Sequence, residues 1–505
     1  MNKITKNLEL LNSDLRKTKN WFIDHLEKLE STVHIYTHLD ADGLSAGAIL
    51  GKALYREKIP FQITVLRQLE REEITKIAEN SKDSKNFLIF ADFGSGQFLE
   101  LTEKLNSSDN KVPFIILDHH LPQNISNKND GKIKDIYSNS RPWHINPYFY
   151  DFDGSDEISG AGICYYFVKI LNERNIDLSP IALVGATGDI QNQGPNKSFT
   201  GLNSMILQHA TKTDLVEVIN DLNFSPTKPL NEAISYSTEI ILPGLSDNTS
   251  KMLKFLKSLG ILMENSQGDI RTLNDLNQEE KQKVSSAIIE YISLKLNIEP
   301  SEIIKKLIVN RYILKNEIVG SELHDLKDFA SILNSCGRSD NASLGIAIAM
   351  GDRRIAYNKA KNNLLNYKKS LVQALSWLKD ENKIQYKNKI QYFFGENVIS
   401  ENIVGTIASM LIFGKEGNID KNKPIFGCAK RKDEEVFKIS GRAHESIVKK
   451  GVNLSEAIRE ALELSNLEAL GGGHPPAAGT KVPIHKIEDF LENCDIVIEK
   501  QLGEN

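Results

Sequence analysis

Four short apolar segments, spaced about 20 to 30 residues apart, constrain the fold of this chain most strongly. They are VHIYT (33–37), FQITVL (61–66), NFLIFAD (86–92) and FIILDHH (114–120), all rich in β-branched or aromatic residues. Segments of this kind form strands, and the stretches between them are long enough for the helices that connect parallel strands. The sequence therefore predicts a mostly parallel α/β sheet between about residues 31 and 200.

Acidic and histidine side chains follow these predicted strands. Residues 38–42 read HLDAD, Asp92 closes the third segment, and residues 118–120 read DHH; His144 and Asp189 come later in the chain. The carboxyl ends of parallel strands meet at one edge of the sheet, where open α/β sheets bind ligands. We therefore expect a cluster of these side chains at that edge.

Carboxylates and imidazoles together suit manganese, iron, zinc or magnesium, and no thiolate belongs to the set. A two-metal centre is the simplest interpretation. His38, Asp40 and Asp42 converge if the strand continues, and they can also converge if it breaks into a tight loop. Gly43 is then expected to turn the backbone into a helix whose free amides favour a nearby anion such as phosphate.

Neighbouring histidines on an extended strand cannot both bind one metal. We therefore assign His119 to a metal and His120 to a substrate phosphate, with Asp118 orienting them. A single aspartate at a strand end more often caps a helix, and His144 is better explained as a loop or packing residue. The coincidence of several such residues at strand ends is what favours a metal centre.

A chain of 505 residues predicts roughly three domains. The first is expected over residues 1–204, with an N-terminal helix over 1–30. Residues 205–330 contain helix-favouring text such as QEEKQKVSSAIIEYISLKL and predict a mostly helical insert or linker domain. Residues 331–505 predict a second α/β domain.

The net charge of −5 argues against a protein that coats nucleic acid, so any such site must be local. Residues 351–370 and 429–432 could form a basic track, with Tyr357 or Tyr367 stacking on bases. A solvated helix face explains the first segment slightly better. Residues 471–473 are glycines that permit close approach of a phosphate, or form a plain turn.

The four cysteines are far apart and form no CxxC pair, which argues against zinc knuckles and disulfides and favours a reducing compartment. The chain has no apolar run of about 18 residues and no signal-peptide pattern at its start. We therefore expect a cytoplasmic protein that does not bind membranes.

Four motifs, in order, resemble those of the DHH phosphoesterase family: THLDADGLSA, ADFGSG, LDHH and GATGD. Near the C-terminus, GGGHPPAAG resembles the signature of the DHH-associated domain, which in the family faces the catalytic domain across a cleft. Other segments look like the archaeal RecJ-like exonucleases, including the GINS-associated nuclease; these are SGAGICYYFVK, LPGLSDN, FASILNSCGRSDNASLGIAIAMGD and SGRAH.

The resemblance implies two divalent metal ions, with manganese favoured, magnesium the alternative and Asp92 bridging them. The implied metal ligands are His38, Asp40, Asp42, Asp92, His119 and Asp189. The implied catalytic residues are Asp118 and His120, with His120 meeting the scissile phosphate. The expected substrate-binding residues of the C-terminal domain are Arg442, Gly472, Gly473 and His474.

The expected function is a metal-dependent exonuclease on single-stranded DNA or RNA, in replication or repair, with GINS and the replicative helicase as possible partners. One alternative is a phosphoesterase for short oligonucleotides, cyclic dinucleotides or pyrophosphate, which would use the same metal centre. Another is a replisome scaffold without catalysis, although such a relative is expected to have lost metal ligands.

Overall fold

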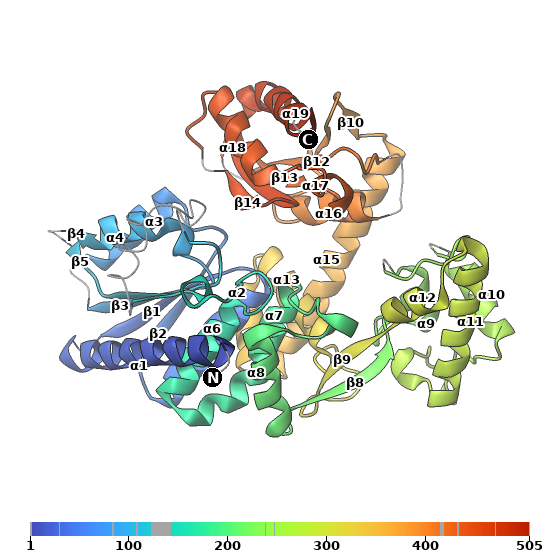
Figure 1. The fold of residues 1–505 in the computed structure, drawn as a ribbon, viewed down its shortest axis with the longest axis horizontal. Helices are drawn as coiled ribbons and strands as arrows, with labels where there is room; N and C mark the ends of the chain where they lie inside the picture. Colours follow the sequence, from blue (N-terminus) through green and yellow to red (C-terminus); the bar gives the residue numbers. More distant parts are fainter. Residues whose placement is uncertain are drawn as a thin grey trace. The chain divides into compact units, whose positions relative to one another are not determined.

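The computed structural model describes residues 3–29, 31–82, 85–107, 110–122, 143–237, 239–246, 248–414, 419–431, 434–469 and 471–503 (Figure 1). The chain divides into two compact units, residues 1–362 and 363–505, each with its own hydrophobic core. Within the described ranges, no helix combines the length and apolar character needed to cross a membrane.

The first unit is built on a parallel sheet with the strand order β2-β1-β3-β6-β7. Its strands are β1 (Thr32–His38), β2 (Phe61–Leu66), β3 (Asn86–Ala91), β6 (Phe114–Leu117) and β7 (His144–Ile145). Every adjacent pair is parallel. The four apolar segments of the sequence are β1, β2, β3 and β6, so the predicted α/β fold with a mostly parallel sheet is confirmed.

Helices cover both faces of this sheet, which is why β3 and β6 are apolar at nearly every position. Leu88 and Phe90 of β3 belong to a core that includes residues of α3 and α4. Phe87 instead packs against Trp21 and Phe22 of α1, with ring centroids 5.1 and 4.9 Å apart. The helices of this region are α1 (Lys3–Leu29), α2 (Ala41–Arg56), α3 (Arg71–Ser81), α4 (Phe98–Leu105), α6 (Gly160–Leu171), α7 (Ser179–Gly188) and α8 (Gly201–Lys212).

The middle of the chain is a helical lobe carried on a two-stranded antiparallel ribbon (Figure 1). The ribbon consists of β8 (Val216–Leu222) and β9 (Ile308–Leu314). Between them lie α9 (Leu230–Ser235), α10 (Thr249–Ser258), α11 (Gln278–Leu296) and α12 (Pro300–Leu307). A separate apolar core holds these helices together. The predicted helical middle is confirmed, and the ribbon is an addition that the sequence did not suggest.

Two further helices, α13 (Leu326–Arg338) and α14 (Ala342–Met350), lie in the first unit and pack against α2. The side chain of Asn334 in α13 accepts a hydrogen bond from the backbone N–H of Ala41 at 2.9 Å. The sequence predicts that the last domain begins at residue 331, whereas the compact units divide between residues 362 and 363. An amphipathic pattern shows that a helix face is buried, but not against which element. The domain limits 1–204, 205–330 and 331–505 stay a prediction.

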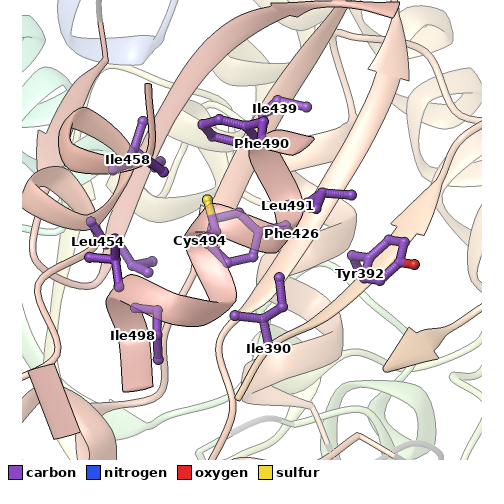
Figure 2. Close-up of a cluster of buried hydrophobic side chains, with 14 of the residues drawn as sticks. Ile390, Tyr392, Phe426, Ile439, Leu454, Ile458, Phe490, Leu491, Cys494 and Ile498 are labelled. Carbon is purple, nitrogen blue, oxygen red and sulfur yellow. The ribbon is translucent and has the colours of Figure 1, made fainter. Parts of the chain in front are cut away.

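The second unit has a mixed sheet with the strand order β10-β11-β12-β13-β15-β14. Its strands are β10 (Gln385–Tyr386), β11 (Gln391–Phe394), β12 (Ile425–Lys430), β13 (Val436–Arg442), β14 (Gly472–His474) and β15 (Ala477–Pro483). Its helices are the end of α15 (Ile355–Asp380), α16 (Val404–Phe413), α17 (Glu445–Val448), α18 (Leu454–Leu464) and α19 (Ile487–Gly503). Figure 2 shows apolar side chains of α18, α19 and the sheet forming one buried cluster.

A glycine in α13 allows this helix to approach the chain between β1 and α2. A Cβ atom on Gly337 would overlap the backbone carbonyl of Leu39. We expect Gly337→Ala to lower the free energy of unfolding by roughly 2 kcal/mol or more, because the overlap outweighs the higher helix propensity of alanine. Urea unfolding of the full chain measures this. Gly96→Ala is the control, since a Cβ there meets nothing within 4 Å; equal unfolding midpoints for the two variants would contradict the expectation.

Candidate metal centre

Eight side chains of the first unit meet at the carboxyl ends of β1, β3 and β6 and at the end of α7. Among the described residues, three groups have possible ligand atoms within 4.8 Å of one another. These groups are His38, Asp40 and Asp92; Asp42, His119 and Asp189; and Asp92, Asp118, His119 and His120. Asp92 and His119 each belong to two groups, so the three form one cluster. It contains every residue of the first unit that the sequence predicts to be a metal ligand or a catalytic residue.

The turn between β1 and α2 places the first of these carboxylates. β1 ends at His38, and Asp40 caps α2 by accepting a hydrogen bond from the N–H of Gly43 at 3.0 Å. The other Asp40 oxygen lies 2.8 Å from Nδ1 of His38. The side chains therefore converge through a tight loop rather than along a continuing strand. Gly43 was expected to precede the helix but lies in its first turn, where a Cβ would overlap the carbonyl of His38.

Asp42 is fully buried and is held by the N-terminus of α6. Its two oxygens accept hydrogen bonds from the N–H groups of Gly160 at 2.6 Å and Ala161 at 3.1 Å. These amides have no partner within the helix, and the positive end of the helix dipole stabilises a carboxylate at this place. Gly185 of α7 lies so close that a Cβ atom would overlap an Asp42 oxygen. Asp42 is thus fixed in position by two helices.

Asp92 is the centre of the cluster and has a left-handed backbone conformation, with φ of 64°. It is 1% exposed, and neither carboxylate oxygen has a hydrogen-bond partner among the described residues. Burial and the negative charges of Asp42 and Asp40 hold the pKa of Asp92 well above its ordinary value. A buried carboxylate without donors is strongly unfavourable unless it is neutralised. Asp92 therefore needs either a proton or a cation.

The Nε2 atom of His119 points at three of the carboxylates. It lies 3.2 Å from Asp92 Oδ1, 3.3 Å from Asp189 Oδ2 and 3.7 Å from Asp42 Oδ2, without a hydrogen bond to any of them. On the other side of the ring, Nδ1 donates to the carbonyl of Gly154 at 2.6 Å. Metal-binding histidines are commonly oriented in this way, with the lone pair of the second nitrogen facing the ion.

Gln191 strengthens this arrangement, although no pattern in the sequence pointed to it. Its side-chain N–H donates to the same Gly154 carbonyl at 2.9 Å, and its oxygen accepts from Asn203 at 2.8 Å. Neither Gln191 nor Asn203 belongs to a sequence motif that marks it as functional. Only the folded chain brings the Gly154 carbonyl next to His119.

Asp118 orients the residues that follow it. Its oxygens accept hydrogen bonds from the backbone N–H groups of Ser95 at 2.8 Å, His119 at 2.8 Å and His120 at 3.1 Å, and from His120 Nδ1 at 2.9 Å. Burial alone would raise the pKa of Asp118, but the charge of His120 and these bonds hold it below its ordinary value. The His120 side chain is 42% exposed, so its remaining nitrogen is available to a substrate.

The donor set fits divalent cations. Burial and then the charge of Asp42 raise the pKa of Asp189 well above its ordinary value. Burial alone would lower the pKa of His119, but Asp189 and Asp42 raise it. A chain without metal must therefore hold protons where a cation would otherwise neutralise the carboxylates. The unpartnered oxygens of Asp92 and the Nε2 atom of His119 are the atoms that such a cation would contact.

His144 lies outside the cluster of ligand groups and has a packing role, as its sequence context favoured. Its Nε2 is 2.7 Å from the hydroxyl of Ser95, and its ring stacks on Phe98 at 5.0 Å. Burial lowers the pKa of His144 to about 3, so the ring is neutral. It supports Ser95, whose N–H holds Asp118.

The predicted substrate-binding residues lie in the second unit, at one corner of its sheet. Arg442 ends β13 and His474 ends β14, and both are in register with Ala477 of the strand between them. Gly473 has a φ of 140°, and a Cβ there would overlap the carbonyl of Ala477. Gly472 has open space around it, and Arg442 Nε donates to the hydroxyl of Ser409 at 2.9 Å. Their role in binding substrate stays a prediction.

Several basic residues of the proposed track form ion pairs within the chain. Arg353 contacts Glu317, and Lys361 contacts Glu322 at 3.3 Å. The Tyr357 hydroxyl donates to Glu322 at 2.6 Å. These contacts favour the structural interpretation of the 351–370 segment over a track for nucleic acid.

Comparison with known families accounts for most of the chain. The model of the DHH family N-terminal domain matches residues 32–188, the DHH-CID domain matches 225–308, and the DHHA1 domain matches 387–500. An uncharacterized protein of Methanocaldococcus jannaschii is 32% identical over 473 residues, which cover 93% of this chain and 94% of that protein.

Two solved structures have similar folds. CDC45 from Entamoeba histolytica has a TM-score of 0.64 at 12% identity, with 97% of this chain and 99% of that chain covered. RecJ from Thermus thermophilus, in complex with Mn²⁺, has a TM-score of 0.55 at 14% identity and covers 96% of this chain. This chain covers 55% of that RecJ chain, about half its length. Identities this low show a shared fold alone.

Replacing Asp92 by asparagine tests whether the cluster holds a cation. We expect Asp92→Asn to raise the melting temperature of the metal-free chain at neutral pH, because it removes the cost of burying this carboxylate or of protonating it, and asparagine tolerates a positive φ. It should also remove most of the stabilisation by Mn²⁺, which for the unmodified chain is about 2.7 kcal/mol at a hundredfold excess over Kd. Thermal unfolding with and without MnCl₂ measures both effects.

Asp151→Asn is the matched control, because Asp151 also has a positive φ, 57°, but is exposed and lies outside the ligand groups. A full Mn²⁺ stabilisation in the Asp92 variant would show that this carboxylate does not bind the ion.

The stabilisation by metal should depend on pH. With the pKa values of Asp92 and Asp189 raised in the folded chain, the metal-free fold loses stability as pH rises through those values. The same protons must leave before a cation binds, so binding strengthens as pH rises. We expect a larger Mn²⁺-induced rise in melting temperature at about pH 8 than at about pH 5.5. Thermal unfolding across this range measures it, and a shift that does not change with pH would contradict it.

Proposed function

The chain belongs to the DHH family of phosphoesterases, and we propose that it is a metal-dependent exonuclease that hydrolyses phosphodiester bonds of single-stranded DNA or RNA. The observation that carries the proposal is the buried Asp92 carboxylate, which has no hydrogen-bond donor among the described residues and belongs to two groups of possible ligands. Such a group is stable beside bound cations and unfavourable without them.

Two ions fit the grouping of the ligands. His38 and Asp40 would hold one, and Asp42, His119 and Asp189 would hold the other. Asp92 would contact both, since its oxygens lie 3.7 Å from His38 Nδ1 and 3.2 Å from His119 Nε2. When bound, such a pair of ions supplies charge neutralisation at the phosphate and a water of lowered pKa. We propose manganese, with magnesium as the alternative, because the ligands are carboxylates and imidazoles and because RecJ, which has a similar fold, has been solved with Mn²⁺.

The protein holds these groups in place before substrate arrives. The first amides of α6 fix Asp42, the Gly154 carbonyl fixes the ring of His119, and Asp118 fixes the ring of His120. Because Nδ1 of His120 is used by Asp118, its Nε2 is the nitrogen that would contact the scissile phosphate. Ligands that are oriented in advance do not have to be ordered during the reaction, which favours catalysis.

We propose a polymer substrate because of residues outside the metal centre. The family resemblance gives Arg442 and His474 of the second unit a role in contacting nucleic acid. A scaffold role alone is disfavoured because the whole predicted ligand set is present. Binding to GINS and the replicative helicase, and a place in replication or repair, belong to this proposal and are supported by the family resemblance only.

A time course with 5′-labelled and 3′-labelled single strands tests the proposal, in MnCl₂, in MgCl₂ and in EDTA. We expect stepwise shortening from one end that requires the metal. A dinucleotide and pyrophosphate are tested beside the strands. Cleavage of these small substrates alone would replace the exonuclease by a small-molecule phosphoesterase. No cleavage of any substrate in MnCl₂ would overturn the proposal.

His120→Gln should separate catalysis from metal binding. We expect kcat to fall by about 100-fold or more, because a phosphate contact in the transition state is lost. The Mn²⁺-induced rise in melting temperature should remain, since His120 is not among the proposed metal ligands. His485→Gln, in the second unit, is the control for both measurements. Loss of the Mn²⁺ stabilisation in the His120 variant would make this residue a metal ligand instead.

A further inference from the structure

An isoleucine beside the metal centre has a backbone conformation that isoleucine seldom adopts. α7 ends with Asp189 as its C-cap, and Ile190 follows with a φ of 60°. The N–H of Ile190 donates to Thr187 at 3.1 Å and that of Gln191 to Ala186 at 2.9 Å, which is the pattern of a Schellman motif. Glycine is the usual residue at this position, and a β-branched residue there is clearly disfavoured.

Packing does not explain why the chain has isoleucine here. The side chain of Ile190 is 63% exposed, so most of it contributes nothing to the core. Its neighbours are both tied to the cluster: Asp189 belongs to a ligand group, and Gln191 donates to the carbonyl that orients His119. An exposed apolar side chain is therefore kept in an unfavourable conformation between two residues of the metal centre.

A second exposed apolar side chain lies next to the cluster on another segment. Leu121 directly follows His120 and is 50% exposed. The two segments meet at the cluster, where His119 Nε2 lies 3.3 Å from Asp189 Oδ2. Each segment therefore carries an exposed apolar residue directly after a residue of the cluster.

We propose that Ile190, together with Leu121, forms an apolar rim against which the organic group on the scissile phosphate packs, namely a nucleobase or its sugar. This inference rests on the proposed phosphodiester hydrolysis and names two residues that would favour its nucleotide substrates over inorganic pyrophosphate. Inorganic pyrophosphate and polyphosphate have no apolar surface and gain nothing from such a rim. A nucleotide gains the burial of apolar area on both partners, which strengthens binding in proportion to that area.

Variants of Ile190 in the full chain test the rim, with Mn²⁺ bound and with dAMP and inorganic phosphate as probes. Ile190→Gly removes the side chain and supplies the residue that the Schellman position prefers. Ile190→Asn keeps a side chain that tolerates a positive φ but is polar. Ile318→Gly is the control, because Ile318 is 79% exposed and is not adjacent to any residue of the cluster. Calorimetry measures both probes, and thermal unfolding measures stability and the effect of Mn²⁺.

For both Ile190 variants we expect the dissociation constant of dAMP to rise about tenfold while that of phosphate stays unchanged. The Mn²⁺-induced rise in melting temperature should be preserved, and the metal-free Ile190→Gly chain should be at least as stable as the unmodified one. The Ile318 variant should match the unmodified chain in binding both probes.

Unchanged dAMP binding in the Ile190 variants would overturn the inference. An equal loss for dAMP and phosphate would also overturn it, since the residue would then act by positioning Asp189. Failure of the proposed function has a different signature, namely an unmodified chain that cleaves no phosphodiester. If such a chain still bound dAMP more tightly than phosphate through Ile190, the rim would stand as a nucleotide contact without catalysis.

Discussion

Mutual repulsion among closely spaced carboxylates is the constraint on which the rest of the first unit depends. Strand and helix ends bring Asp40, Asp42, Asp92 and Asp189 together, and the other three raise the pKa of Asp92. Hydrogen bonds relieve this repulsion only in part, since Asp42 receives two amides and Asp92 receives none from the described residues. The fold therefore stores an electrostatic strain that the remaining packing must outweigh, and bound cations would release it.

Close approach of backbone makes this concentration of charge possible. Gly160 faces Asp92 and Gly185 faces Asp42 at distances that leave no room for a methyl group. Gly337 similarly lets α13 lie against the chain beside Asp40. These contacts mean that helices, rather than loops, fix the carboxylates. A site built on rigid elements keeps its geometry better than one built on loops, which suits ligands that must not relax away from each other.

Much of the site could be predicted from the sequence because its signals are local. Apolar runs mark the strands, and the residues directly after them must lie at one sheet edge, so His38, Asp92 and His119 were found in this way. The supports could not be predicted. The Gly154 carbonyl orients His119, and the buried side-chain amide of Gln191 donates to that carbonyl. Asn334 of α13 accepts a hydrogen bond from the first residue of α2. No sequence pattern predicts which residues these three contact. Ile190 has no sequence signal either, because its distinctive feature is a positive φ.

The ribbon that carries the helical lobe bears on how this chain can vary during evolution. Because β8 and β9 are paired along their whole length, with Val216 opposite Leu314, the chain leaves the first unit and returns to it at nearly the same point. The lobe has its own core and is in that sense a self-contained module. Lineages could therefore enlarge, shorten or exchange it by changing residues between the two strands, with little disturbance of the parallel sheet or the carboxylates at its edge.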